Sequence, residues 1–239
     1  MIRHGLTRIG AHTPERWVHW LNAAVNYIEV GCWLRTRGFP VPRRFRTREE
    51  LYEAIARDIA DQHVLYLEFG VFEGQATRYW SRLLRHPQSA LHGFDSFEGL
   101  QTRWNIDTPA GSFSTKGQVP QIDDPRVRWF KGWFEDTLPT YAPPVHDRLI
   151  VNLDADLYAP TGFVLAHLEP MITPGAILIF DEFSDRANEL RAFEEFLDRS
   201  GKRFRLLGAT RAVTHVAFEC VEGAGRSAAP TGRSVVDSH

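Results

Sequence analysis

The feature that most constrains the fold is a series of short, continuously apolar segments that alternate with helical patterns. Five of them carry a glycine or an acid at or near their carboxyl end: "HVLYLEFG", "ALHGFDSF", "RVRWFKGWF", "RLIVNLDADLY" and "AILIFDEF". Runs that are apolar on both faces are typical of strands in a parallel sheet covered by helices. Two last runs, "RFRLLGA" and "AVTHVAFEC", are separated by a short turn and predict an antiparallel pair. The sequence therefore predicts an α/β fold with a mostly parallel sheet and helices on both faces.

The main domain is predicted to span residues 47–222, with a segment on either side. A helix over Thr47–Gln62 begins with a capping box made by Thr47 and Glu50. Residues 1–46 form an N-terminal helical segment, which either packs on the main domain or serves as a lid. Its helix over Pro14–Arg35 carries an apolar stripe of Trp17, Leu21, Val25 and Ile28. Residues 223–239 are small, polar and unpatterned, which predicts a disordered tail.

Composition and charge exclude several classes of function. With a net charge of −2 over 239 residues, the chain has no nucleic-acid footprint. No apolar run approaches the roughly 18 residues of a membrane span, and residues 1–10 lack the apolar region of a signal peptide. Cys32 and Cys220 lack metal-ligand spacing, so neither a zinc site nor a disulfide framework is expected. These features predict a cytoplasmic protein that acts on a small molecule.

In such a sheet the ligand site lies at the carboxyl ends of the strands. After the first strand, Gly70 and Gly74 flank a tight turn into a helix, where backbone amides can face a ligand. The spacing is G-x-x-x-G and lacks the G-x-G-x-x-G of NAD-dependent oxidoreductases. Asp95 ends the second strand, where an acid commonly accepts hydrogen bonds from ribose hydroxyls. The alternative role for Asp95 is to cap the next turn.

The remaining strand ends carry aromatic and acidic side chains. Trp133 and Phe134 could form a wall for an adenine ring or belong to the core. Asp154, Asp181 and Glu182 follow neighbouring strands and are expected to converge. Crowded carboxylates repel one another, and a divalent cation such as Mg²⁺ relieves that repulsion. The alternative is that these acids cap helices or pair with arginines such as Arg148 and Arg186.

Five blocks in this order resemble those of class I S-adenosylmethionine-dependent methyltransferases, and in particular the macrocin O-methyltransferase (TylF/MycF-type) family. They are "YLEFGVFEGQATRYW", "HGFDSFEGL", "GWFEDTLP", "NLDADLY" and "PGAILIFDEF", covering roughly residues 66–183. The resemblance implies a Rossmann-like seven-stranded sheet whose last strand is inserted antiparallel. It also implies methylation of a hydroxyl on a sugar-like natural product, and often a homo-oligomer.

The resemblance further implies which residues form the site. Metal ligands would be Asp154, Asp181 and Glu182, holding Mg²⁺. S-adenosylmethionine would be bound by Glu68, Gly70, Val71, Gly74, Asp95, Ser96, Phe97, Trp133 and Asp154.

This chain departs from the family pattern in two places. The family usually ends the fifth strand with Asp-Asp, where this chain has Asp181 and Glu182. Metal-dependent relatives of the catechol type place a lysine base three residues after the strand-four aspartate, where this chain has Leu157, which excludes a lysine base there.

The general base is expected to be Asp156 or Asp154, because a nearby carboxylate suffices once the acceptor oxygen is fixed. His146 is a further candidate, although its alternative role is that of a surface histidine. The alternatives for function are a metal-independent methyltransferase of the same fold and a non-catalytic cofactor-binding subunit of a larger complex.

Overall fold

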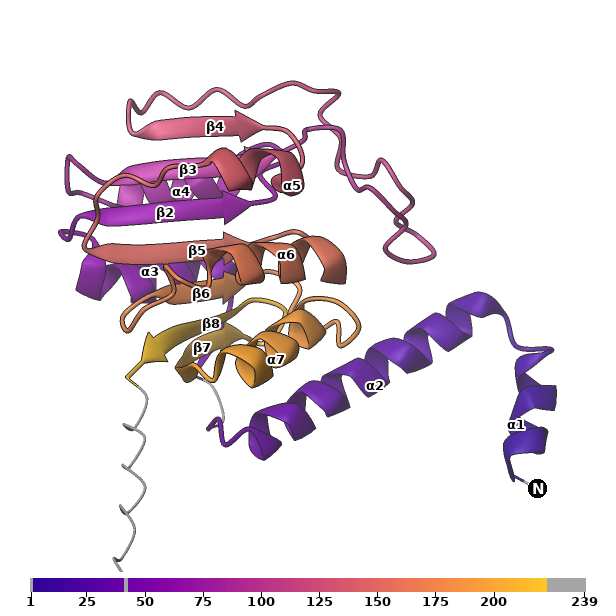
Figure 1. Cartoon of the computed structure of the whole chain (residues 1–239). Coiled ribbons are helices and arrows are strands. Elements are labelled where there is room, and N and C mark those ends of the chain that lie inside the picture. Colours follow the sequence, from indigo (N-terminus) through magenta and orange to yellow (C-terminus); the bar gives the residue numbers. More distant parts are fainter. Residues whose placement is uncertain (1, 41–42, 223–239) are drawn as a thin grey trace, which may run out of the picture.

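A computed structural model of the chain describes residues 2–40 and 43–222, and its centre is one twisted sheet (Figure 1). The strands lie in the order β1-β7-β8-β6-β5-β2-β3-β4. All neighbours pair in parallel except β8, which is antiparallel to both β6 and β7. The bounds are Arg44–Phe45 for β1, Val64–Phe69 for β2, Ala90–Asp95 for β3, Val127–Lys131 for β4, Arg148–Leu153 for β5, Ile177–Phe180 for β6, Arg203–Thr210 for β7 and Val216–Val221 for β8.

This topology confirms the predicted fold class and the inserted antiparallel strand. The sheet has eight strands instead of seven, because β1 adds two residues to the edge at β7, with Arg44 opposite Ala209. A two-residue strand is too short to show a period in the sequence. The predicted fourth strand was too long at its carboxyl end, since β5 stops at Leu153. The predicted tail, 223–239, lies outside the described residues.

Helices cover both faces of the sheet, with α3 and α4 behind it and α5, α6 and α7 in front (Figure 1). Each face buries its own apolar cluster, centred on Trp80 behind and Phe180 in front. Burying such a side chain contributes about 1.5–3 kcal/mol. The bounds are Ile2–Gly10 for α1, Glu15–Thr36 for α2, Arg48–Ile59 for α3, Gln75–Leu83 for α4, Phe134–Thr137 for α5, Tyr158–Leu168 for α6 and Glu189–Ser200 for α7, with a 3-10 turn at Leu138–Thr140.

Helix α3 begins as its sequence predicts. The Glu50 amide donates to Thr47 Oγ1 at 3.3 Å, and Glu50 Oε2 accepts from the Arg46 amide at 2.8 Å. This reciprocal cap fixes the position of Arg48, the first residue of the helix. An arginine at a helix N-terminus opposes the helix dipole, so another interaction has to favour it there.

Helix α2 forms where expected, but its stripe does not pack on the main domain. Only Val30, Trp33 and Leu34, near its carboxyl end, are buried. The rest runs out past the carboxyl ends of the strands, with α1 beyond it (Figure 1). Of the two alternatives for this segment, packing on the main domain therefore holds only for the carboxyl end of α2. Within residues 2–40 and 43–222, none of the helices combines the length and the apolar character needed to cross a bilayer.

Candidate functional site

A cavity of about 340 Å³ opens at the carboxyl edge of the sheet, between the ends of β2, β3, β5 and β6. Its volume is within the range of small-molecule sites. Most of the predicted site residues line it. They are Glu68, Gly70, Val71, Asp95, Ser96, Trp133, Asp154, Asp156, Asp181 and Glu182.

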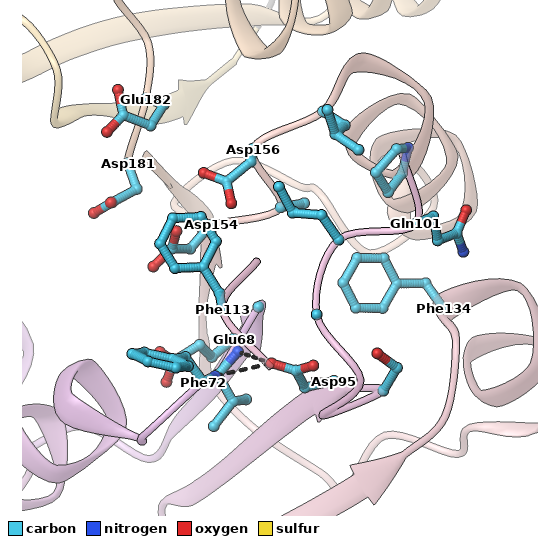
Figure 2. A pocket seen from close by; sticks show the side chains of 18 of the residues that line it. Glu68, Phe72, Asp95, Gln101, Phe113, Phe134, Asp154, Asp156, Asp181 and Glu182 are labelled. Carbon is cyan, nitrogen blue, oxygen red and sulfur yellow. Dashed lines mark hydrogen bonds between the residues drawn. The ribbon is translucent and has the colours of Figure 1, made fainter. Parts of the chain in front are cut away.

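The glycine loop after β2 is held by Asp95 at the end of β3. Asp95 Oδ2 accepts from the amides of Val71 at 2.7 Å and Phe72 at 2.8 Å, drawn as dashed lines in Figure 2. Asp95 Oδ1 accepts from the Phe97 amide at 2.7 Å. The carboxylate therefore caps the next turn, as one prediction had it. A carboxylate has about four acceptor sites, so capacity remains for a ligand hydroxyl.

Two predicted cofactor residues, Gly74 and Phe97, lie behind the cavity wall and are not among its lining residues. Gly74 is the N-cap of α4 with φ of 73°, and an added Cβ would lie 3.1 Å from Pro120. Phe97 is fully buried with φ of 62°. The resemblance implied a cofactor role for both, but the sequence could not show which side chains face the cavity.

Glu68 is buried at the bottom of the cavity, where its Oε2 accepts from the Thr77 hydroxyl of α4. Burial raises the pKa of Glu68 to about 8, and the hydrogen bond from the Thr77 hydroxyl offsets this only in part. An acid in this state is largely protonated at neutral pH and acts as a neutral hydrogen-bonding group.

The turn after β5 has an unusual backbone conformation. Asp156 has φ of 60°, and the Leu157 amide donates to the Ala155 carbonyl at 2.6 Å, which closes a γ-turn. This conformation is strained for a residue other than glycine, and such strain tends to occur at functional sites. The turn directs Asp156 into the cavity beside Asp154 (Figure 2).

Four carboxylates, those of Asp154, Asp156, Asp181 and Glu182, gather on one side of the cavity (Figure 2). Burial, followed by repulsion from Asp181, raises the pKa of Asp154 well above its ordinary value. Burial and the charge of Glu182 raise the pKa of Asp156 to about 7. Burial and Asp181 raise the pKa of Glu182 to about 7 as well.

Asp181 differs from the other three because two basic side chains lie against it. His215 Nε2, just before β8, lies 2.9 Å from Asp181 Oδ1, and an Arg48 nitrogen lies 3.5 Å from the same atom. Neither contact is a well-directed hydrogen bond, since Oδ1 has no hydrogen-bond partner among the described groups. Burial alone would raise the pKa of Asp181, but His215 and Arg48 outweigh it and lower the pKa.

The sequence did not single out Arg48 and His215. Arg48 also donates to Gln75 at the start of α4, at 3.3 Å, and so links α3, α4 and β6. For Arg48 the sequence contained one signal that was not used: an arginine in the first turn of a well-capped helix, where a positive charge opposes the helix dipole. His215 had no local signal, because only the antiparallel insertion of β8 places it beside β6.

A third missed residue, Glu189 of α7, supports Glu182 from below. Its Oε2 accepts from the Glu182 amide at 2.9 Å. Glu189 is fully buried, and burial followed by repulsion from Asp181 raises its pKa well above the ordinary value. A neutral Glu189 can hold the backbone after β6 without adding charge to the cavity.

The predicted metal ligands have the donor atoms that Mg²⁺ prefers, but they do not lie close enough together to bind it. Asp154, Asp181 and Glu182 supply the hard oxygen donors that Mg²⁺ prefers, and their mutual repulsion is relieved by a cation. Over residues 2–40 and 43–222, however, no three His, Cys, Asp or Glu side chains are close enough together to hold a metal ion. The set would have to draw together on binding.

Aromatic side chains from the segment between β3 and β4 close the cavity on its outer side. Phe113 stands edge-on to Phe72 at 6.0 Å between ring centroids, and both are partly exposed. The Trp104 indole nitrogen donates to Asp185 Oδ2 at 2.9 Å, which ties this segment to the loop after β6. An acceptor entering from this side would meet an apolar surface.

Trp133 and Phe134, for which two roles were open, differ in their surroundings. Trp133 is half-buried and lines the cavity. Phe134 lines it too and packs edge-on against Phe69 of the core, at 5.4 Å. His146 lies before β5, at the other end of the strand from the cavity, so it is not positioned to act as base.

The buried acids predict how stability depends on pH when no divalent cation is added. Between the pKa of a free glutamate and about 8, folded Glu68 keeps its proton while the unfolded chain has lost it. Stability must therefore fall as pH rises through this window. From pH 6 to pH 8 we expect Glu68 to contribute a loss on the order of 2 kcal/mol, or several degrees in Tm. Thermal melts of the wild type and Glu68→Gln check this. The variant should show the shallower slope, and equal slopes would contradict the assignment.

Comparison with known proteins identifies relatives over most of this region. The family model described as Macrocin-O-methyltransferase (TylF) matches residues 42–206. Mycinamicin III 3''-O-methyltransferase of Micromonospora griseorubida is 34% identical over 119 residues, 48% of this chain and 43% of that protein. The 8-demethyl-8-(2,3-dimethoxy-alpha-L-rhamnosyl)-tetracenomycin-C 4'-O-methyltransferase of Streptomyces olivaceus is 39% identical over 138 residues, 49% of this chain and 52% of that protein.

The chain spans about half the length of the curated relatives it matches. Among solved structures, the calicheamicin methyltransferase CalS11 superposes with a TM-score of 0.57. It is 21% identical, and the match covers 90% of each chain. At that identity the likeness concerns the fold alone.

Proposed function

Because the chain belongs to the macrocin O-methyltransferase (TylF) family, we propose that it methylates a hydroxyl of a small, sugar-like natural product with S-adenosylmethionine as donor. One observation carries this proposal. A glycine loop held by Asp95 and a group of buried carboxylates meet in the same cavity. The names of the two relatives, which place methyl transfer on oxygens of a mycinamicin and of a rhamnosyl tetracenomycin, support this acceptor class.

On the cofactor side, Asp95 has two tasks. It fixes the amides of Val71 and Phe72, and its remaining lone pairs accept from ribose hydroxyls. Gly70 allows close approach to the loop, Glu68 presents a neutral carboxyl at the bottom, and the exposed edge of Trp133 covers the adenine. When bound, S-adenosylmethionine supplies an electrophilic methyl group on a sulfonium.

On the acceptor side, Asp156 takes the proton of the reacting hydroxyl, with Asp154 as the alternative base. A base works best when its pKa is near the working pH, and the pKa of Asp156 is raised to about 7. The cavity walls align the acceptor oxygen with the methyl group. Alignment of two reactants supplies up to about 7–11 kcal/mol of the barrier.

The proposal includes Mg²⁺, which Asp154, Asp181 and Glu182 would hold. When bound, the ion lowers the pKa of an acceptor hydroxyl and fixes its oxygen. Titration calorimetry with MgCl₂ tests binding without any need for turnover. Binding by the wild type and its loss in Asp181→Ala would support the site, and no heat from the wild type would remove Mg²⁺ from the proposal.

A metal-independent methyltransferase of the same fold is the second candidate. The observation that favours it is the pairing of Asp181 with His215 and Arg48, which already neutralises one of the three acids. Turnover that is undiminished with excess EDTA would decide for this alternative.

The overall test is turnover. The chain, S-adenosylmethionine and a panel of glycosylated polyketides bearing free sugar hydroxyls are incubated together, and S-adenosylhomocysteine and acceptor mass are followed. A gain of 14 mass units on one acceptor supports the proposal. Binding of S-adenosylhomocysteine without turnover on any acceptor would indicate a non-catalytic subunit, and no binding would overturn the function.

We expect Asp95→Asn to weaken S-adenosylhomocysteine binding at least ~30-fold. The amide oxygen accepts fewer bonds, and its NH₂ group faces amide donors of the loop. Loss of hydrogen bonds to a charged group costs about 1.5–3 kcal/mol each. Calorimetry measures the dissociation constant, and Asp123→Asn, outside the cavity lining, is the matched control. Unchanged affinity in Asp95→Asn would exclude the ribose role.

A further inference from the structure

Arg48 is the one basic side chain among the described residues that line the cavity, whereas eight of the lining residues are aspartates or glutamates. Most of the cavity wall therefore favours cations and repels anions. S-adenosylmethionine nevertheless carries a carboxylate at the end of its methionine part. Enclosing that carboxylate among other acids is costly unless a cation pairs with it.

The guanidinium group of Arg48 has only long contacts with the protein. Its Nε lies 3.4 Å from Glu49 Oε1, and its two terminal nitrogens lie 3.3 Å from Gln75 Oε1 and 3.5 Å from Asp181 Oδ1. Charge-assisted hydrogen bonds between such groups are normally about 2.7–2.9 Å long. An arginine has five N–H donors, so Arg48 keeps donors for a ligand in the cavity.

Arg48 also lies on the side of the glycine loop that the methionine part would reach. Its contacts are with Gln75, which opens α4 after the loop, and with Asp181, which follows β6. Across this part of the sheet the strands lie in the order β6-β5-β2-β3-β4. With the ribose on Asp95 after β3 and the adenine against Trp133 after β4, the methionine part extends over the ends of β2 and β5, toward Arg48.

The pairing of Arg48 with Asp181 matches the two charges of an amino acid. The methionine part carries its carboxylate and its ammonium group on the same carbon atom. Arg48 and Asp181 place a cation and an anion 3.5 Å apart, and Asp181 Oδ1 is buried without a hydrogen-bond partner among the described groups. An ammonium group has three N–H donors for such an acceptor. A zwitterion would therefore satisfy both side chains, which a simple anion would not.

Given the proposed function, on which this assignment rests, we propose that Arg48 binds the carboxylate of the methionine part of S-adenosylmethionine. A guanidinium group can hold a carboxylate through two parallel hydrogen bonds. This contact also explains an arginine at the start of α3, where its charge opposes the helix dipole. The reciprocal cap made by Thr47 and Glu50 fixes the backbone there and so holds Arg48 at the cavity wall.

The test compares two ligands by titration calorimetry of the full chain, with EDTA present so that no divalent cation takes part. 5′-Methylthioadenosine keeps the adenosine and the sulfur of S-adenosylhomocysteine but lacks the carboxylate and the ammonium group. In Arg48→Gln we expect the affinity for S-adenosylhomocysteine to fall at least ~10-fold, because hydrogen bonds between charged groups are lost. The affinity for 5′-methylthioadenosine should not change.

Two further variants serve as controls. Arg57→Gln removes the same charge from an exposed position of the same helix, outside the cavity lining, and should bind both ligands as the wild type does. Arg48→Lys keeps the charge but loses the paired geometry of the guanidinium group. Its affinity for S-adenosylhomocysteine should lie between those of the wild type and Arg48→Gln.

The outcomes that contradict the assignment are distinct. If Arg48→Gln bound S-adenosylhomocysteine as tightly as the wild type, Arg48 would not hold the carboxylate, and the proposed function would stand. Equal losses for both ligands would also overturn the assignment, because they would show that Arg48 only supports the shape of the cavity through Gln75 and Asp181. A wild type that bound neither ligand would overturn the proposed function itself.

Discussion

Gly70→Ala is expected to abolish measurable binding of S-adenosylhomocysteine, a loss of at least ~100-fold, and to lower Tm by several degrees. Gly70 has φ of 93°, which L side chains rarely adopt. An added Cβ would overlap the Asp154 carbonyl oxygen and lie 2.7 Å from its carbon. Both atoms are backbone, so the clash is relieved only if the glycine loop moves away from the turn that carries Asp154 and Asp156. Calorimetry and a thermal melt of the same sample measure both effects.

A matched control is available at Gly162, in the middle of α6. This glycine has no positive φ, and an added Cβ would find nothing within 4 Å. Gly162→Ala should leave cofactor binding unchanged and stabilise the protein by about 0.5–1 kcal/mol, since alanine loses less backbone entropy in a helix. If the two variants behaved alike, the close approach at Gly70 would have no functional meaning.

The second large effect is expected from Asp156→Asn, which should lower kcat by roughly 10²–10⁴-fold and leave S-adenosylhomocysteine affinity within a factor of about three. The change removes the proton acceptor but keeps the shape of the side chain. Asparagine also tolerates the positive φ of 60° at this position better than most residues. A drop in kcat would therefore reflect loss of the proton acceptor and not a change in the backbone of the turn. The assay is S-adenosylhomocysteine release with the acceptor found in the panel.

Glu135→Gln, at the exposed start of α5 on the rim of the cavity, removes one carboxylate without touching the buried acids. It should retain most of the activity. An Asp156→Asn enzyme with near-normal kcat would transfer the base role to Asp154, and the same measurement on Asp154→Asn would then show the larger loss.

The sheet and its carboxyl edge could be predicted because both rest on local patterns. Each buried strand is a continuous apolar run, and several site residues lie at or just after the end of such a run, as Asp95 and Asp154 do. In a parallel sheet the ends of neighbouring strands meet, so the sequence order of the motifs also gives their proximity in space. The family resemblance added the antiparallel insertion of the last strand.

The partners of Asp181 could not be predicted in the same way. His215 lies just before β8 and Arg48 begins α3, separated from Asp181 by 34 and 133 positions in the chain. His215 lies within the predicted strand run "AVTHVAFEC" and Arg48 in the first turn of a predicted helix, but neither pattern marks a site. The role of each depends on topology, since β8 reaches β6 only by inserting between it and β7.

The apolar stripe of α2 shows a different limit. A period of 3.6 residues identifies which side of a helix is apolar but not what covers it. The sequence left both packing on the main domain and a lid open, and the structure shows Trp17, Leu21, Val25 and Ile28 exposed. The period therefore identified the apolar side of α2, but only the carboxyl end of this helix packs on the main domain.

The position of β8 has a consequence for synthesis on the ribosome. It is the last strand in chain order that the structure describes, yet it lies between β6 and β7 inside the sheet. Until it emerges, β6 presents an open edge of unpaired backbone groups, and β7 with β1 has nothing to join. Until β8 is available, the nascent chain can therefore form the sheet only in two separate parts, one ending at β6 and the other made of β1 and β7. A ribosome paused before residue 216 would expose an edge that chaperones, or another unfinished chain, could bind.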